Sequence, residues 1–228
     1  MTRLLGFLAL IAIAGQMTAP DGHATYLSLG GKIPLWLKIV HTLFLCVLVP
    51  AYWIHYGPAN FLWFSDIALL ATLAALWLES RLLASMQAVS VALLELAWLV
   101  DFLIALVTGV SVLGISGYMF KPEIPLFIRG LSLFHVWLPF LLVWLVWRLG
   151  YDRRAWLCQS LLALVVLPVT YWLTDPKDNV NWVHGLGRPQ TALPPWTYLA
   201  VLILAFSLVL YLPPHLAFSY LPLSVMSS

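Results

Sequence analysis

The chain alternates long apolar runs with short polar joints, and this pattern predicts its fold. Six runs reach or approach the ~20 residues that an α-helix needs to cross ~30 Å of hydrocarbon. They are about Ile33 to Tyr56, Ala59 to Leu78, Leu82 to Val110, Ile124 to Leu149, Ala155 to Leu173, and Trp196 to Leu212. Because lipid offers the backbone no hydrogen-bond partners, each run is expected to be helical. We therefore expect an all-α fold, a polytopic transmembrane helical bundle.

A further, shorter apolar segment lies at the N-terminus. Residues 1–20 have a basic start, an apolar centre and small residues at the end, which is the outline of a secretory signal peptide. The same stretch could instead be a short first span from Leu4 to Thr18, a little under the roughly 17-residue lower limit for spanning. We favour a retained segment, which would bring the bundle to seven helices.

Most of the polar joints are short, and one is not. The joint from Asp175 to Pro195 is long enough to have structure of its own, and proline and glycine punctuate it. This composition favours an ordered loop at the membrane interface over a flexible linker. Since no internal repeat or low-complexity segment is present, residues 1–228 are read as a single integral membrane domain.

Basic residues give a weak preference for one orientation. If Lys32 is cytoplasmic, six lysines and arginines lie inside and five outside. The short cluster Arg148, Arg153 and Arg154 favours this orientation under the positive-inside rule. A cleaved N-terminal segment would then leave residue 21 on the wrong side, so we expect residues 1–20 to be retained with the N-terminus outside. The 175–195 loop is also expected outside.

Composition excludes several classes of function. The chain is 63% hydrophobic and 9% charged, against roughly 25% charged residues in soluble domains. Its formal net charge is only +2, and no run of basic residues exceeds two, so we expect no nucleic acid partner. Cys46 and Cys158 lie in separate apolar runs without CxxC spacing, which favours packing over a disulfide or zinc site. Membrane lipids are the expected partners.

Three ionisable residues inside the predicted spans form the candidate site. Counting ~1.5 Å per residue from the proposed outer ends, Asp66 lies roughly 12 Å deep, and His135 and Glu95 about 16 Å, if the long third helix tilts. Charged groups at such depth face one another or water, so these three are expected to floor a cavity open to the outer face. Polar residues nearer its mouth are candidate binding residues: His55, Asn60, Asp101, Asn179, Asn181 and His184.

Several chemistries fit this set of residues. Catalysis would use His135 as base, a carboxylate to orient it, and Ser65 or Ser132 as a hydroxyl nucleophile. Carboxylates and histidine at this depth are also typical of proton or ion passage. A divalent metal is a third possibility, although no HxxxH or HExxH spacing supports it, and the three groups could simply pair and lock the helices. No bound metal or cofactor is predicted.

Four stretches carry a resemblance to a known family: HYGPANFLWFSDIALL (His55 to Leu70), LSLFHVWLP (Leu131 to Pro139), GYDRRAW (Gly150 to Trp156) and LTDPKDNVNWVHG (Leu173 to Gly185). Through them the chain resembles a family of small bacterial multi-pass proteins known only as membrane-associated proteins. The resemblance covers about residues 33–217. It implies a multi-pass membrane protein and carries no established activity.

A more distant resemblance points towards an enzyme. The layout is similar to an integral membrane acyltransferase-like family, in which the second strong helix opens with a His-x-Cys pair and a later helix bears histidine. The pair falls on Trp63 and Ser65 here, so both reactive residues are replaced, and His135 and Asn179 to Trp182 match the later elements. This resemblance implies a lipid-directed, acyl-transfer-like enzyme. Taken with the depth estimate above, it makes His135 with Asp66 and Glu95 the expected catalytic residues. A proton-coupled or small-molecule transporter and a non-catalytic scaffold subunit are the alternatives.

Overall fold

The computed structural model describes residues 31–220, and every regular element in that range is helical. The principal helices are α2 (Leu35–Tyr56), α3 (Phe64–Leu78), α4 (Arg81–Thr108), α5 (Leu126–Leu131), α6 (Phe134–Leu149), α7 (Ala155–Leu173), α8 (Pro195–Ala205) and α9 (Leu212–Tyr220). Short turns η1 (Pro58–Leu62), η2 (Gly117–Phe120) and η3 (Val180–Trp182) lie in the connections, and a π-helical stretch, η4 (Phe206–Tyr211), joins α8 to α9. Residues 1–20, the predicted N-terminal segment, lie outside the described residues.

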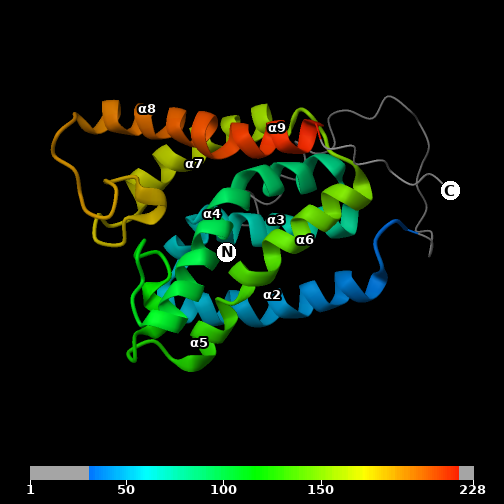
Figure 1. Ribbon diagram of the computed structural model, residues 1–228, viewed down its shortest axis with the longest axis horizontal. Helices are drawn as coiled ribbons and strands as arrows, with labels where there is room; N and C mark the ends of the chain where they lie inside the picture. Colours follow the sequence, from blue (N-terminus) through cyan, green and yellow to red (C-terminus); the bar gives the residue numbers. More distant parts are fainter. Residues whose placement is uncertain (1–30, 221–228) are drawn as a thin grey trace.

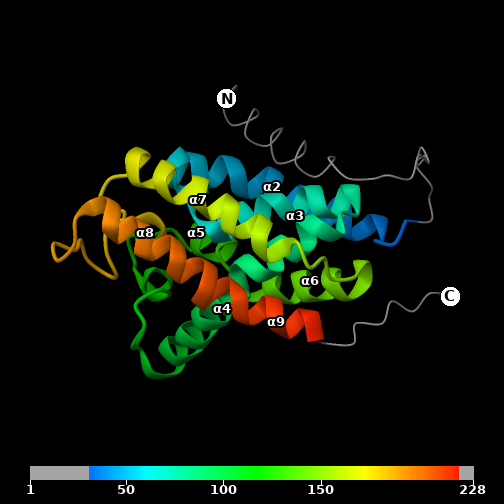
Figure 2. The same ribbon diagram turned by 90° about the horizontal axis from the view of Figure 1, so that it is seen from above.

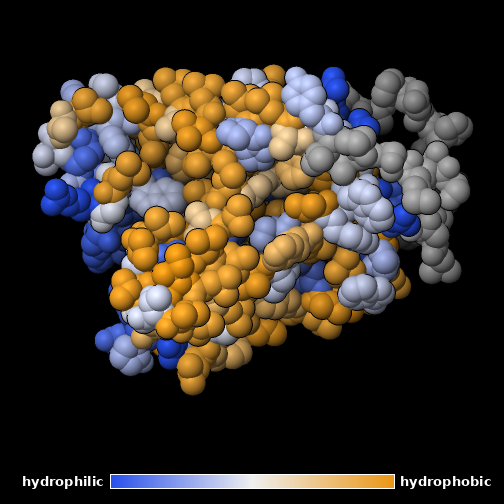
Figure 3. Space-filling model, viewed as in Figure 1, coloured by the Kyte–Doolittle hydropathy of each residue, from blue (hydrophilic) through white to orange (hydrophobic). Residues whose placement is uncertain are grey.

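Five helical segments are long and apolar enough to cross a membrane. They are Leu35–Tyr56, Arg81–Thr108, Leu126–Leu149, Ala155–Leu173 and Pro195–Tyr220. Large hydrophobic side chains such as Ile54 and Val107, 84% and 85% exposed, cover the flanks of these helices. Figure 3 shows this broad apolar face, with hydrophilic residues gathered towards the two ends. An apolar surface of this extent is typical of contact with lipid, and we conclude that the chain is a multi-pass membrane protein.

The second predicted span is shorter than the sequence indicated. The expected helix from Ala59 to Leu78 begins only at Phe64, so α3 has 15 residues and a length of roughly 22 Å. Its start is fixed from a distant loop, because the amide of Asn181 accepts from the Phe64 N–H at 3.1 Å and donates to the Leu62 carbonyl at 2.7 Å. Those backbone groups are therefore unavailable for a longer α-helix.

The last predicted span is longer than expected, running to Tyr220 instead of Leu212. Proline has no N–H and its ring crowds the preceding turn, so Pro213 and Pro214 would normally interrupt an α-helix. The π-helical stretch Phe206–Tyr211 directly precedes them and changes the hydrogen-bond register. The Ser207 carbonyl accepts from the Trp156 indole N–H at 2.8 Å, which ties this stretch to α7.

Helix α4 is the centre of the bundle and packs against α3, α6 and α7 (Figures 1 and 2). Small residues occupy its contacts: Ala84 and Ala88 of α4 are fully buried, as is Ala75 of α3. Small side chains let helix backbones approach closely, which is how helices associate where lipid removes the hydrophobic driving force. Glu95, near the middle of α4, is thereby held where neighbouring helices converge.

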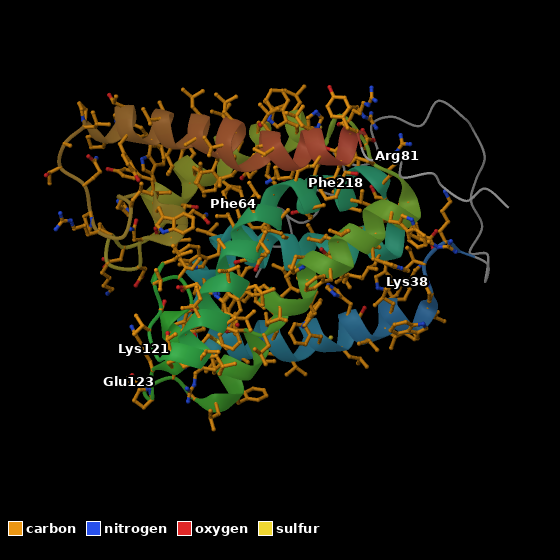
Figure 4. All side chains as sticks on the ribbon, in the orientation of Figure 1. Lys38, Phe64, Arg81, Lys121, Glu123 and Phe218 are labelled. Carbon is orange, nitrogen blue, oxygen red and sulfur yellow. The ribbon has the colours of Figure 1, made fainter. Side chains whose placement is uncertain are left out.

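The two ends of the bundle differ in their connections. The long connections 109–125 and 174–194 lie at one end, called the loop end, on the left in Figures 1 and 2. The short connections after α3 and α6 lie at the opposite end, called the turn end. Figure 4 shows Lys121 and Glu123 at the loop end and Lys38 and Arg81 at the turn end. Among residues 31–220 the turn end has six lysines and arginines and the loop end four. A cytoplasmic turn end stays a prediction.

Two carboxylates hold the turn end together. Glu79 accepts from the Lys38 ammonium at 2.9 Å and from the backbone N–H of Lys32 at 2.8 Å. Partial burial alone would raise the pKa of Glu79, but these hydrogen bonds outweigh it and lower the pKa. The pKa of Asp152 is also lowered, chiefly by hydrogen bonds from the side chain of Arg154. Both carboxylates thus remain ionised and neutralise part of the basic turn end.

Candidate functional site

A hydrogen bond between α4 and α6 is the centre of the candidate site. The Glu95 Oε2 atom lies 2.7 Å from the His135 Nδ1 atom, with 2% of the Glu95 side chain and 14% of the His135 side chain exposed. No described residue forms a hydrogen bond with the other ring nitrogen, Nε2. A carboxylate that accepts from Nδ1 favours the tautomer that carries its proton there and leaves Nε2 unprotonated. His135 is therefore arranged to accept a proton at Nε2.

Local structure explains why these two side chains meet. Helix α5 ends at Leu131 and α6 begins at Phe134, which puts His135 in the first turn of α6. On α4, Trp98 follows Glu95 by three residues and so shares its face. The indole of Trp98 stacks on the His135 imidazole, with ring centroids 4.7 Å apart and planes at 24°. The carboxylate and the indole together fix the orientation of the imidazole.

Asp66 lies near this pair but does not contact His135. It is in the first turn of α3, 4% exposed, and its Oδ2 atom accepts one long hydrogen bond of 3.4 Å from the Asn60 side chain. Its Oδ1 atom is buried and has no hydrogen-bond partner among residues 31–220. Glu95 is close enough for the two carboxylates to interact electrostatically. Asp66, Glu95 and His135 thus share one region of the bundle, with the hydrogen bond confined to the last two.

Tyrosines complete this region, and the sequence interpretation missed them. The Tyr52 hydroxyl lies 2.6 Å from the Ser132 Oγ atom, joining α2 to the break between α5 and α6. Tyr118 of η2 also interacts with Ser132, and it is close enough to Asp66 and Glu95 to interact with them electrostatically. Burial raises the pKa of Tyr118, so its phenol stays protonated.

Neither predicted nucleophile has its hydroxyl hydrogen-bonded to the His135 ring, although the Ser132 carbonyl accepts from the His135 backbone N–H at 3.2 Å. Ser132 Oγ is engaged with Tyr52 and with the Ile128 carbonyl, the latter at 3.3 Å. Ser65 is half-buried, and none of the hydrogen bonds formed by the described residues involves its side chain. A covalent intermediate on either serine stays a prediction.

Asp101, a predicted binding residue, holds the connection after α4. It is fully buried and accepts four hydrogen bonds of 2.7–2.9 Å. The donors are the hydroxyls of Ser111 and Ser116 and the backbone N–H groups of Leu113 and Ser116. All four hydrogen bonds thus come from the connection that follows α4, and a binding role for Asp101 stays a prediction.

The loop that carries the predicted asparagines is held by their side chains. The Asn179 amide donates to the Gly185 carbonyl at 2.7 Å and accepts from the His184 N–H at 3.0 Å, while Asn181 joins the loop to the start of α3. Asn179, Asn181 and Trp182 adopt left-handed backbone angles, with φ of 41°, 50° and 58°. Asparagine tolerates this conformation better than most residues. The loop is thus fixed against the membrane-embedded helices.

His184 borders a pocket of about 140 Å³ beneath this loop, which Tyr171 and Tyr198 also line. Its ring lies 4.7 Å from the Tyr171 ring, and its Nε2 atom is buried without a partner. Neither this pocket nor the wider one beside it is lined by Asp66, Glu95 or His135. The cavity expected above those residues stays a prediction. His55, another predicted binding residue, is exposed and contacts the Tyr56 ring at 4.5 Å.

Metal binding has no support among residues 31–220. No group of three or more histidine, cysteine, aspartate or glutamate side chains in this range is arranged to hold a metal ion. Glu95 and His135 alone supply two ligands, fewer than the three protein ligands of a typical catalytic zinc site.

The chain was compared with family models, with curated proteins and with solved structures. None of the three comparisons yields a match. The family resemblance stated above is thus supported only in its coarser part. The chain is an apolar multi-helix protein with five candidate membrane spans.

Proposed function

We propose that this protein is a lipid-directed enzyme whose Glu95–His135 pair acts as the general base in acyl transfer. The observation that carries the proposal is the 2.7 Å contact at Nδ1, while Nε2 of the partly exposed imidazole has no hydrogen-bond partner among the described residues. Because the pair lies among membrane-spanning helices, a substrate that reaches it from the bilayer is apolar over most of its length. A lipid with a hydroxyl group meets that requirement.

The reaction would proceed as follows. His135 Nε2 removes the proton of the lipid hydroxyl as that oxygen attacks the carbonyl carbon of an acyl donor. Glu95 stabilises the imidazolium that forms, since a carboxylate beside an imidazolium favours its charged state. The new ester bond forms, the bond to the leaving group breaks, and that group departs with a proton, so His135 must afterwards release the proton that it took from the hydroxyl. No serine of the chain is needed as an acyl carrier.

The location that goes with this proposal is the bacterial inner membrane, with the turn end in the cytoplasm and the site open to the outer face. The larger number of lysines and arginines at the turn end supports that orientation. The 175–195 loop would then cover the outer mouth of the site, where His184 and its pocket are available to a lipid headgroup.

The proposal is tested with purified protein in vesicles that contain a radiolabelled acyl donor and hydroxyl-bearing lipids. We expect Glu95→Gln to slow label transfer about 10- to 100-fold, since a hydrogen bond to a charged group contributes about 1.5–3 kcal/mol. The matched control is His215→Gln, which changes a histidine that hydrogen-bonds Tyr151 at the turn end. A wild-type protein that transfers no label to any lipid contradicts the proposal. If Glu95→Gln lowers only thermal stability, the pair is structural and the scaffold alternative is preferred.

Proton-coupled transport is a second candidate, and one specific observation favours it. Asp66 is a buried carboxylate with an unpartnered oxygen near a second carboxylate, and such groups inside membranes are typical of proton relays. Reconstituted vesicles with an internal pH indicator distinguish the two functions. Proton flux that Asp66→Asn abolishes, in a protein that leaves lipids unchanged, would establish transport in place of acyl transfer.

A further inference from the structure

Two buried aspartates near the loop end have contrasting surroundings. Asp101 accepts four hydrogen bonds of 2.7–2.9 Å, enough to satisfy an ionised carboxylate. Asp66 is 4% exposed and accepts a single bond of 3.4 Å, from Asn60, while its Oδ1 atom is buried without a partner. A buried carboxylate that lacks donors is strongly disfavoured in its charged form. The surroundings of Asp101 thus stabilise a carboxylate anion, whereas those of Asp66 do not.

The charged and titratable groups around Asp66 do not compensate for this lack of donors. Its electrostatic neighbours are Glu95 of α4, Tyr52 and Tyr56 of α2, and Tyr118 of η2. None of these four can carry a positive charge. Glu95 is hydrogen-bonded to His135, and an imidazole that acts as the base supplies no positive charge to Asp66. A second anion at Asp66 would have no cation among its described neighbours.

We propose that Asp66 holds a proton at neutral pH and is the general acid of the site, complementary to the Glu95–His135 base. This inference rests on the proposed acyl transfer. Two carboxylates placed in unlike surroundings commonly divide the acid and base roles in this way. Glu95 assists proton removal through His135, whereas Asp66 donates its proton.

The proton balance of the reaction then closes within the site. The lipid hydroxyl gives its proton to His135 Nε2 as its oxygen bonds to the acyl carbon. The bond from that carbon to the leaving group breaks, and the leaving group takes the proton of Asp66. The proton held by His135 then returns to the Asp66 carboxylate, which restores both groups. Donor and acceptor are the only reactants, and no net proton is gained or lost.

Infrared spectroscopy of the purified protein in lipid at neutral pH tests the protonation directly. We expect the wild type to show the C=O stretching band of a protonated carboxylic acid, shifted by exchange into D₂O. Asp66→Asn should remove this band, and Asp101→Asn should leave it in place. Asp66→Glu, which keeps a carboxyl group, should move the band without abolishing it, and this variant serves if Asp66→Asn does not fold. A wild type without the band, or a band that survives in Asp66→Asn, overturns the inference.

Leaving-group dependence tests the catalytic role separately. A poor leaving group needs a proton in the transition state more than a good one does. We expect Asp66→Asn to slow transfer from an oxygen-ester donor about 100-fold and from an activated aryl-ester donor less than tenfold. Equal slowing with both donors overturns the acid role. A wild type that shows the infrared band but transfers no acyl group contradicts the proposed function while leaving the protonation of Asp66 established.

Discussion

Replacing His135 by alanine is expected to slow acyl transfer by about 10²–10⁴-fold, the range typical of losing a general base. The physical reason is that Nε2 is the only described atom arranged to remove the substrate proton, with Glu95 on Nδ1 and Trp98 against the ring. The substitution also leaves the Glu95 carboxylate buried without its partner. The measurement is the initial rate of label transfer in vesicles, normalised to folded protein.

Chemical rescue separates lost chemistry from lost structure in this variant. Added imidazole can enter the space left by the side chain and accept the proton, so it should restore part of the rate in His135→Ala and none in Glu95→Gln. His41→Ala is a matched control for removing a buried histidine, because the His41 ring contacts the Leu69 carbonyl at 3.1 Å and not the site. Equal rate losses in His41→Ala and His135→Ala would contradict a special role for His135.

Asp101→Ala is expected to be the most destabilising single substitution at the loop end, by about 3 kcal/mol or more. It removes the acceptor of four hydrogen bonds, and donors left unsatisfied in a buried setting cost about 1–3 kcal/mol each, although such costs are not additive. The connection that follows α4 should loosen, and with it Tyr118. Unfolding in detergent micelles, followed by the denaturant midpoint, measures the change.

The control for this prediction is another aspartate at the loop end. Asp178 is exposed, and its side chain forms no hydrogen bond with any described residue, so Asp178→Ala should change stability by less than about 0.5 kcal/mol. Asp101→Asn keeps the shape and one acceptor oxygen and is expected to lie between the two. A loss of stability in Asp101→Ala no larger than in Asp178→Ala would show that the four contacts contribute little.

The sequence predicts a membrane span well where the local amino-acid composition determines its ends. Apolar runs bounded by charged or glycine-containing joints correspond to α2, α4 and α7, because the length of an apolar run sets the length of a membrane span unless a distant contact intervenes. The predicted start of α3 was wrong because the side chain of Asn181, 117 residues away, accepts a hydrogen bond from the Phe64 N–H. The predicted end of the last span, Leu212, was wrong because a π-helical stretch lets the helix continue through Pro213 and Pro214.

The candidate site shows the same division. Counting depth along the helices indicated that Glu95 and His135 could meet, and they form a hydrogen bond; their roles stay predictions. Tyr118 could not be found in this way, because it lies on a connection whose path depends on Asp101 and not on helical periodicity. The sequence also could not predict the contrast between Asp66 and Asp101, since both are aspartates within apolar runs, towards the loop end of the bundle. The two differ in the number of hydrogen-bond donors around each carboxylate, which depends on the fold.

The most direct test of the account is a double-mutant cycle on the rate of acyl transfer with Glu95→Gln, His135→Ala and the combined variant. If Glu95 acts only through His135, its substitution should cost nothing once the imidazole is gone, so the double variant should be no slower than His135→Ala. This non-additivity is the result that we predict. Losses that multiply in the double variant would show that the two residues act independently and would contradict a Glu95–His135 general base.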